Sequence, residues 1–155
     1  MLLGMPKPLP IEFIVQTVST SNALLRASRR LFRPHGLSEA QFNVLHILQD
    51  AAGNLTQREL SEILIVDRSN VTGLVDRMET AGWVKRLPVP GDRRAHRLAL
   101  TASGRKLWKA TYPIYEKAAR AVVAKLSPAQ LKATRSLLAI VEASANEQPA
   151  KQTVD

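Results

Sequence analysis

The side chains best suited to chemistry lie on one face of a helix that we predict between Asp67 and Gly82. An apolar stripe at i, i+3, i+4 and i+7 would anchor this helix, and it consists of Val71, Leu74, Val75 and Met78. Small and hydrogen-bonding residues occupy the opposite face and its flanks; they are Ser69, Asn70, Thr72, Gly73, Asp76, Arg77 and Thr80. Such a face can exchange hydrogen bonds with base edges and phosphates, although a polar helix face taken alone is more often simply solvated.

The residues after this helix predict a two-stranded hairpin with a basic end. Trp83–Leu87 and His96–Leu100 are short mixed runs typical of half-buried strands. Pro88–Ala95 lies between them, and its two prolines and one glycine mark a turn with Arg93 and Arg94 near the tip. Guanidinium groups suit the negative potential of a narrow minor groove. Directly after a helix with a polar face, this hairpin favours a nucleic-acid-binding wing over a solvated turn.

Three capping boxes mark the starts of further helices, at Ser38–Gln41, Thr56–Glu59 and Ser127–Gln130. The helix opened by Thr56 ends near Val66, so it forms a helix-turn-helix with the helix that starts at Asp67. Thr56 and Gln57 lie at a helix N-terminus, where backbone N–H groups attract anions, and are therefore candidates for a phosphate contact.

The ends of the chain predict long helices. We expect an extended arm over Met1–Pro10, where three prolines oppose a helix, and then a helix over Ile11–Arg33. Thr101 should cap a largely apolar helix that Pro113 kinks or interrupts. These terminal helices carry more apolar surface than a small core can cover, so we expect a symmetric dimer rather than a monomer that packs them on itself.

Composition narrows the function classes. The 155 residues are long enough for one domain, and 22 Lys and Arg against 13 Asp and Glu give a net charge of +9. This excess indicates a polyanionic partner, with nucleic acid ahead of a membrane surface. No apolar run is long enough to cross a bilayer and the first ten residues do not resemble a signal peptide, so the expected location is the cytoplasm.

Enzyme and metal chemistry find little support in the sequence. The chain has no cysteine, which excludes disulfides and thiolate metal sites. It has no Gly-rich phosphate loop, and its three histidines are not at metal-ligand spacing. We therefore expect no catalytic residues, no metal and no cofactor.

Taken together, several motifs resemble the MarR family of bacterial transcription regulators over about Ile11 to Ala145. They are Leu60–Leu64, Asp67–Thr72, Leu74–Glu79, Gly82–Arg86, Gly91–Arg94 and Leu100–Gly104. The resemblance implies a mainly α fold, with a winged helix-turn-helix core and a two-stranded β wing between N- and C-terminal dimerisation helices. In residue numbers, it implies one domain over 1–155, with the winged helix-turn-helix at 38–100 and dimerisation helices at 11–33 and 101–146.

The resemblance also implies a function. Members of this family are homodimeric repressors, or less often activators, that bind a near-palindromic operator. They commonly release the operator when a small, often aromatic, molecule binds between the DNA-reading lobe and the dimer lobe. The Asp-x-Arg of the family's wing maps onto Asp92 and Arg94, whereas Gly73 departs from the longer polar residue of many relatives. The expected DNA-binding residues are Thr56, Gln57, Arg68, Ser69, Asn70, Thr72, Gly73, Asp76, Arg77, Asp92, Arg93 and Arg94.

Four aromatic side chains are candidates for an effector pocket, namely His35, His46, Tyr112 and Tyr115. For each of them a core or surface role is the commoner one. The alternative function is a winged-helix module for protein contacts without a DNA partner. Its exposed helix face and wing should be apolar or acidic, whereas here they are polar and carry arginine.

Overall fold

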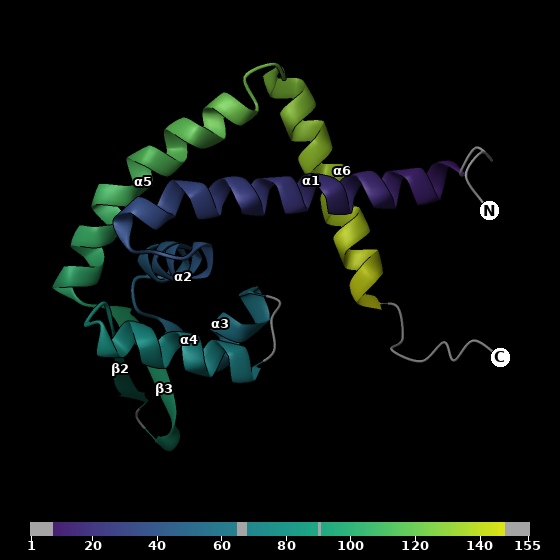
Figure 1. The fold of residues 1–155 in the computed structure, drawn as a ribbon. Coiled ribbons are helices and arrows are strands. Elements are labelled where there is room, and N and C mark those ends of the chain that lie inside the picture. The colour runs from purple at the N-terminus through teal and green to yellow at the C-terminus, as the bar shows by residue number, and fades with distance from the viewer. Residues whose placement is uncertain (1–7, 65–67, 90, 148–155) are drawn as a thin grey trace, which may run out of the picture. The chain divides into compact units, whose positions relative to one another are not determined.

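Figure 1 shows the computed structural model, which describes residues 8–64, 68–89 and 91–147. The side chains of residues 68, 69 and 92–95 lie outside this description. The elements in chain order are α1 (Leu9–Phe32), η1 (Arg33–His35), α2 (Glu39–Asp50), β1 (Leu55–Thr56), α3 (Gln57–Leu64), α4 (Arg68–Thr80), β2 (Val84–Val89), β3 (Asp92–Leu100), α5 (Ala102–Val122) and α6 (Pro128–Glu147). The mainly helical winged helix-turn-helix expected from the sequence is confirmed.

The chain divides into two compact units, Met1–Tyr115 and Glu116–Asp155. The first unit contains the helix-turn-helix, the sheet and the aromatic part of α5, and the second contains the end of α5 and all of α6. Pro113 lies within α5, two residues before the boundary, yet α5 continues through it. Of the two expected outcomes, a kink or an interruption, the interruption is therefore wrong, because a proline removes only one of the many backbone bonds of a long helix.

The core of the first unit gathers apolar residues from α1, α2, α3, α4, β2 and β3, together with Leu37. Its buried residues are Phe32, Leu37, Phe42, Val44, Leu45, Leu48, Leu60, Val71, Leu74, Val75, Met78, Val84, Leu98 and Leu100. Phe32 and Phe42 stack with their ring centroids 4.1 Å apart, which joins the end of α1 to the start of α2. All four residues of the apolar stripe predicted on the 67–82 helix belong to this core.

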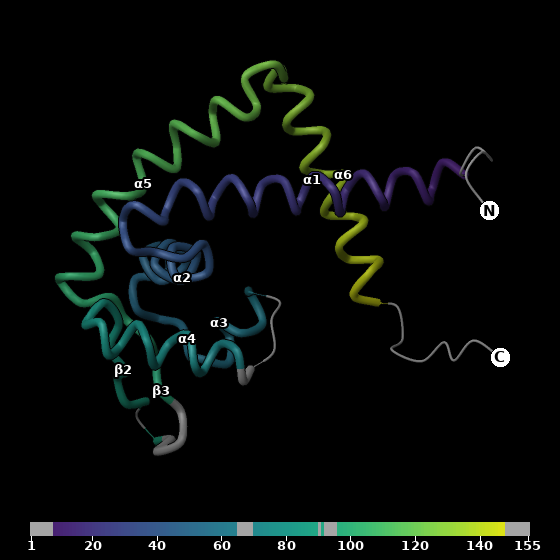
Figure 2. Tube along the Cα trace, in the orientation of Figure 1, coloured from purple at the N-terminus to yellow at the C-terminus, as the bar shows by residue number. Residues whose placement is uncertain are grey.

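The sheet is larger than the predicted hairpin. It has three antiparallel strands in the order β1-β3-β2, and β1 pairs Leu55 with Leu98 and Thr56 with Arg97. The pairing of β2 with β3 continues to Val89 and Asp92, with an irregularity between Pro88 and Val89. The prediction of a loop over Pro88–Ala95 is therefore too long, since cross-strand bonds formed by tertiary pairing extend both strands. We call the hairpin of β2 and β3 the wing, and Figure 2 traces its two strands beside α4.

The helix ends follow the local signals. All three capping boxes are present, as in the bonds from Gln41 N to Ser38 Oγ and from Ser38 N to the Gln41 side chain. Gly82 ends α4 with φ +72°, and Trp83 N donates to Met78 O at 2.9 Å, as in a Schellman motif.

The predicted extended arm over Met1–Pro10 is wrong for its last two residues. Leu9 and Pro10 belong to α1, because backbone N–H groups in a first helical turn have no helical acceptor and proline loses little there. Residues 1–7 lie outside the described residues. Within the described ranges, none of the helices combines the length and the hydrophobicity of a transmembrane span.

Candidate nucleic-acid interface

The helix α4 buries one face in the core and exposes a polar face on the opposite side. Val71, Val75 and Met78 are fully buried beneath it. The side chains on the other side are exposed, and among the described candidates they are Asn70, Thr72, Asp76 and Arg77. A helix fixed to its core by one face while the other carries hydrogen-bonding groups has the form needed to enter a major groove.

For several of the predicted contact residues the structure describes the backbone but not the side chain. Arg68 and Ser69 lie in the first turn of α4, and Asp92, Arg93 and Arg94 lie at the start of β3, but their side chains are outside the described residues. Asp67, where we predicted the start of this helix, is also outside them. The backbone nevertheless brings the candidate residues onto two neighbouring elements, the helix α4 and the wing (Figure 1).

The glycine at position 73 leaves room for an arginine. A Cβ atom built on Gly73 would lie 3.4 Å from Nη1 of Arg77, so the Arg77 guanidinium extends back along α4 towards this glycine. A longer side chain at position 73 would compete with Arg77 for the same space. The departure from the longer residue of many relatives therefore favours Arg77 as the cation on this part of the face.

The start of α3 is built around Thr56 and Glu59. Thr56 donates from its backbone N–H and from its hydroxyl to Glu59 Oε2, at 2.7 and 2.8 Å. These two bonds, the backbone bond first, hold the pKa of the Glu59 carboxyl below its ordinary value. Because the hydroxyl of Thr56 is engaged within its own capping box, a phosphate contact at this helix start would fall mainly to neighbouring groups.

A hydrogen-bonded network joins α3, α4 and β2. Gln57 Nε2 donates to Thr72 Oγ1 at 2.8 Å, and Gln57 Oε1 accepts from Arg86 Nη2 at 3.3 Å. The same Arg86 guanidinium pairs with Asp76 at 2.5 Å and with Glu79 through Nη1. The pKa of Arg86 is raised above its ordinary value, mainly by the hydrogen bond to Asp76 and further by the negative charge of Glu79. Three predicted contact residues are thus bonded into one cluster.

Arg86 and Glu79 are the members of this network that the sequence analysis did not single out. A signal for them was present, since Val84 and Arg86 are two residues apart on one strand and therefore point to the same face of the sheet. A cation on the same side as a buried valine needs an acidic partner. Asp76 and Glu79, on the helix that precedes this strand, are the acids among which the partner could be sought.

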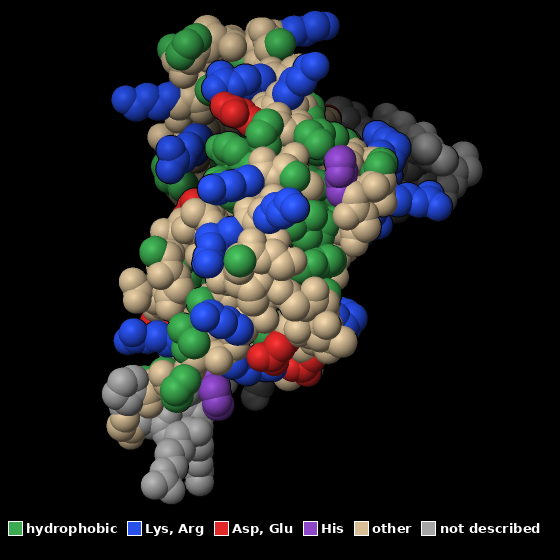
Figure 3. Space-filling model, turned by 90° about the vertical axis from the view of Figure 1, so that its left-hand side faces the viewer, with side chains coloured by type: hydrophobic (Ala, Val, Ile, Leu, Met, Phe, Trp, Pro, Cys, Tyr) green, Lys and Arg blue, Asp and Glu red, His purple; other side chains and the backbone are tan. Residues whose placement is uncertain are grey.

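Basic side chains extend beyond the helix-turn-helix. Lys and Arg side chains are spread over the face drawn in Figure 3, whereas acidic side chains are sparse there. This distribution accords with the net charge of +9 and gives a field that attracts a polyanion.

Three of the four predicted effector residues lie in an aromatic cluster between α2 and α5. The ring centroid of His46 is 5.5 Å from that of Tyr112 and 6.5 Å from that of Tyr115, and Trp108 stacks on Tyr112 at 4.9 Å. Within the described part of the chain, His46 Nδ1 and Trp108 Nε1 are buried without a hydrogen-bond partner. His35 is exposed on η1 and takes no part in these ring contacts.

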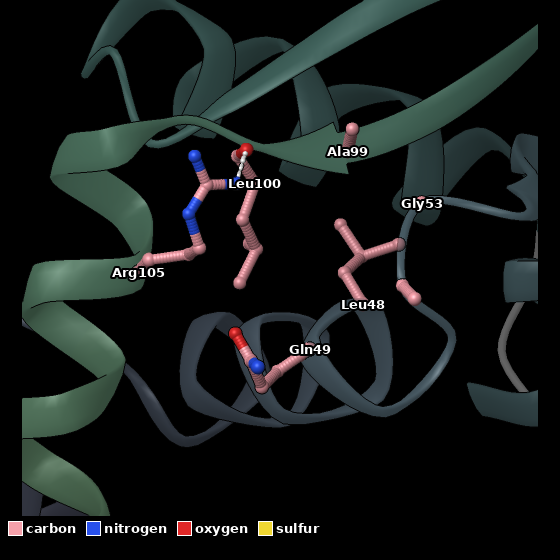
Figure 4. Close-up of a pocket in the computed structure, with 7 residues that line it drawn as sticks. Leu48, Gln49, Gly53, Ala99, Leu100 and Arg105 are labelled. Atoms are coloured by element: carbon pink, nitrogen blue, oxygen red, sulfur yellow. Dashed lines mark hydrogen bonds between the residues drawn. The ribbon is translucent and has the colours of Figure 1, made fainter.

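A cavity of about 290 Å³ lies between the end of α2, β3 and the start of α5 (Figure 4). Its wall combines aliphatic groups with the Gln49 amide and the Arg105 guanidinium, and Arg105 Nη1 donates to the carbonyl oxygen of Leu100 at 2.7 Å. None of the four predicted effector residues lines it. However, Gln49 is one helical turn after His46 and Arg105 one turn before Trp108, so the cavity adjoins the aromatic cluster.

Comparisons with known proteins agree with this geometry. A model of the MarR family matches residues 35–95. The chain is 29% identical over 132 residues to the HTH-type transcriptional regulator PecS of Dickeya dadantii, covering 83% of this chain and 80% of PecS. It is 41% identical over 71 residues to the multiple antibiotic resistance protein MarR of Escherichia coli, a match that covers 46% of this chain and 49% of MarR.

Solved structures give the same result. A mutant of Escherichia coli MarR complexed with operator DNA superposes with a TM-score of 0.72 at 27% identity, covering 86% of this chain and 94% of that one. AbsC, a MarR family regulator from Streptomyces coelicolor, shares the fold with a TM-score of 0.82 at 21% identity, covering 94% and 100%. The matched motifs, the exposed face of α4 and the wing beside it lead to one conclusion: the chain belongs to the MarR family of winged helix-turn-helix transcriptional regulators, which bind DNA and are not enzymes.

Proposed function

We propose that this protein is a homodimeric repressor that binds a near-palindromic operator in double-stranded DNA and releases it when a small effector binds. In this proposal residues 38–100 read the DNA, and residues 11–33 and 101–146 form the dimer lobe. The observation that carries the DNA-reading part is α4, which buries one face in the core and exposes Asn70, Thr72 and Arg77 beside the wing. A cytoplasmic location stays a prediction.

We assign the contacts by the element on which each residue lies. Asn70 and Arg77, with Arg68 and Ser69 in the first turn of α4, are proposed to read the major groove. Arg94, organised by Asp92 and accompanied by Arg93, is proposed to enter the minor groove from the wing. Thr72 and Gln57 would act as a bonded pair at the edge of this face.

Exposed apolar side chains support the dimer. Within the first unit, α1 exposes Ile11, Ile14, Val15, Val18, Leu24 and Leu25. Within the second unit, the exposed apolar side chains are Val122, Leu126, Leu137, Leu138 and Ile140. Exposed apolar surface on this scale marks an interface, and a second copy related by two-fold symmetry would match the symmetry of a palindromic operator.

The proposal is tested by titrating DNA at several salt concentrations with the wild-type protein and with Arg94→Ala. Operator fragments are first selected from genomic DNA, and affinity is then measured by gel shift. We expect wild-type affinity to fall steeply with salt, because bound phosphates release counterions. Arg94→Ala should weaken operator binding by more than ~1 kcal/mol, the scale of one good specific contact. A protein indifferent to every duplex at low salt would refute the function, and unchanged Arg94→Ala affinity would refute the wing contact.

The effector is proposed to be a small aromatic acid held at the cavity of Figure 4. Arg105 would bind its carboxylate, and the ring would extend towards His46, Tyr112 and Tyr115. The buried Nδ1 of His46 and the Nε1 of Trp108 would offer it further hydrogen bonds. His35 is exposed on η1 and would contribute only at the edge of such a site.

Benzoate is the probe for this site, with the neutral benzamide as its comparison. We expect benzoate to release the operator, and Arg105→Met to raise the half-maximal concentration about tenfold, the loss of one charge-assisted hydrogen bond. Lys106→Met removes the same charge from the exposed neighbour and should leave that concentration unchanged. If benzoate releases no DNA, or acts equally on Arg105→Met, the site is not the one described.

A further inference from the structure

Arg86 occupies a central position in the helix-turn-helix without lying on its exposed face. Its side chain is 23% exposed, and its guanidinium bonds to Asp76 and Glu79 on α4 and to Gln57 on α3. Its backbone N–H also donates to Glu79 Oε1 at 3.3 Å. One residue of the wing strand β2 is therefore tied to both helices of the DNA-reading motif.

We propose that Arg86 is the positioning residue that sets the DNA-reading helix α4 against the wing and neutralises the acids of that helix. The inference rests on the proposed function, since it concerns how the same DNA site is held. Arg86 acts through Asp76, Glu79 and Gln57, and it contacts neither a base nor a phosphate.

The charges of α4 explain why such a residue is needed. Asp76 and Glu79 are 55% and 39% exposed on a helix that would lie against phosphates. Unpaired, these two carboxylates would repel the DNA backbone at every sequence. The Arg86 guanidinium pairs with both of them, which leaves Asn70 and Arg77 to determine how the face interacts with DNA.

The bonding of Arg86 argues against a direct phosphate contact. Both terminal nitrogens of its guanidinium are engaged, Nη1 with Glu79 and Nη2 with Asp76 and Gln57. Arginine suits this task because its planar fork addresses several acceptors in fixed directions, whereas lysine acts as a point charge.

The network also orients a predicted contact. Gln57 accepts from Arg86 with its Oε1 and thereby directs its Nε2 towards the Thr72 hydroxyl, at 2.8 Å. Loss of Arg86 would release Gln57 and so change how Thr72 is presented. Loss of Arg86 should therefore reduce selectivity among sequences as well as general affinity for DNA.

The test compares affinity for the selected operator with affinity for a random duplex across a salt series. Arg86→Met should lower the affinity for both duplexes, because two carboxylates lose their partner, and should also reduce the operator-to-random ratio by about tenfold, the discrimination of one good base contact. Its salt slope for the random duplex should stay unchanged, because no phosphate contact is lost. Arg86→Lys should restore the affinity for the random duplex, because the positive charge returns. It should not restore the operator-to-random ratio, because lysine cannot bond several acceptors in fixed directions.

Two further variants complete the design. Glu79→Gln removes one carboxylate of the network at a residue outside the predicted DNA contacts, and it should reduce the ratio while raising affinity for the random duplex. It also tests the inference if Arg86→Met does not fold. Lys85→Met removes the same charge from the exposed neighbour on β2 and should leave the ratio unchanged.

The outcomes separate the two proposals. A wild-type protein that binds no duplex would overturn the proposed function itself. If the wild-type protein binds DNA, but Arg86→Met and Glu79→Gln both keep the wild-type operator-to-random ratio, only the positioning role is overturned. A salt slope reduced by about one in Arg86→Met would show Arg86 to be a phosphate contact and would equally overturn it.

Discussion

Replacing Gly104 with alanine is expected to lower the free energy of unfolding by roughly 3 kcal/mol, although alanine is the better helix former. Gly104 is buried in the first turn of α5, and a Cβ atom there would lie 2.0 Å from the carbonyl oxygen of Trp83. That oxygen accepts from Thr101 N at 3.0 Å, and the Thr101 hydroxyl donates to Gly82 O at 2.6 Å. The start of α5 is therefore fixed against the end of α4, and backbone must shift to admit a methyl group.

Urea unfolding followed by circular dichroism measures this effect. Ser103→Ala is the matched control, since it makes a change of similar size at the exposed neighbouring position of the same helix and should change stability by less than about 0.5 kcal/mol. If Gly104→Ala were as stable as the wild type, or more so, the close approach of α5 to Trp83 would be contradicted.

Replacing Leu137 with aspartate is expected to convert the proposed dimer into a monomer and to weaken operator binding about a hundredfold. Leu137 lies on α6 and is 60% exposed in the single chain, so the substitution removes no core contact within the second unit. A carboxylate buried in a dimer interface without a partner is strongly unfavourable. A monomer binds one half-site at a time and loses the effective concentration that a linked second site provides.

Analytical ultracentrifugation gives the oligomeric state, and gel shifts give the affinity for the operator and for an isolated half-site. Half-site affinity should be unchanged, because the DNA-reading elements are intact. Ser136→Asp adds the same charge at the adjacent exposed position and should retain more of the dimer and of the operator affinity. A dimeric Leu137→Asp protein with wild-type operator affinity would show that this part of α6 is not in the interface.

Helix boundaries show why part of the fold could be predicted. Each capping box joins residues three positions apart, and Gly82 ends α4 through bonds to the residues just before it. The apolar stripe of α4 follows from the helical period alone. Signals of this kind are contained in a short segment, so they could be identified without knowing what the segment packs against.

The exposure of the candidate DNA-reading face could be predicted from the same local pattern. The polar face of α4 follows from the period that defines its apolar face, and Asn70, Thr72, Asp76 and Arg77 are exposed as expected. The bonds among these residues were not predicted. Their partners come from other elements, and sequence distance gave no indication of them.

Local signals in the sequence were enough to predict most of the helices, their capping boxes, the polar face of α4 and the family. How these parts bond to one another depends on the packing of distant segments. This packing pairs β1 with β3, joins Gln57 to Arg86 across 29 positions, and brings Gly104 against Trp83. The two kinds of signal differ in range, because capping and amphipathic period act within a few residues, whereas strand pairing, ion pairing and close backbone contact depend on where the packed core brings distant segments together.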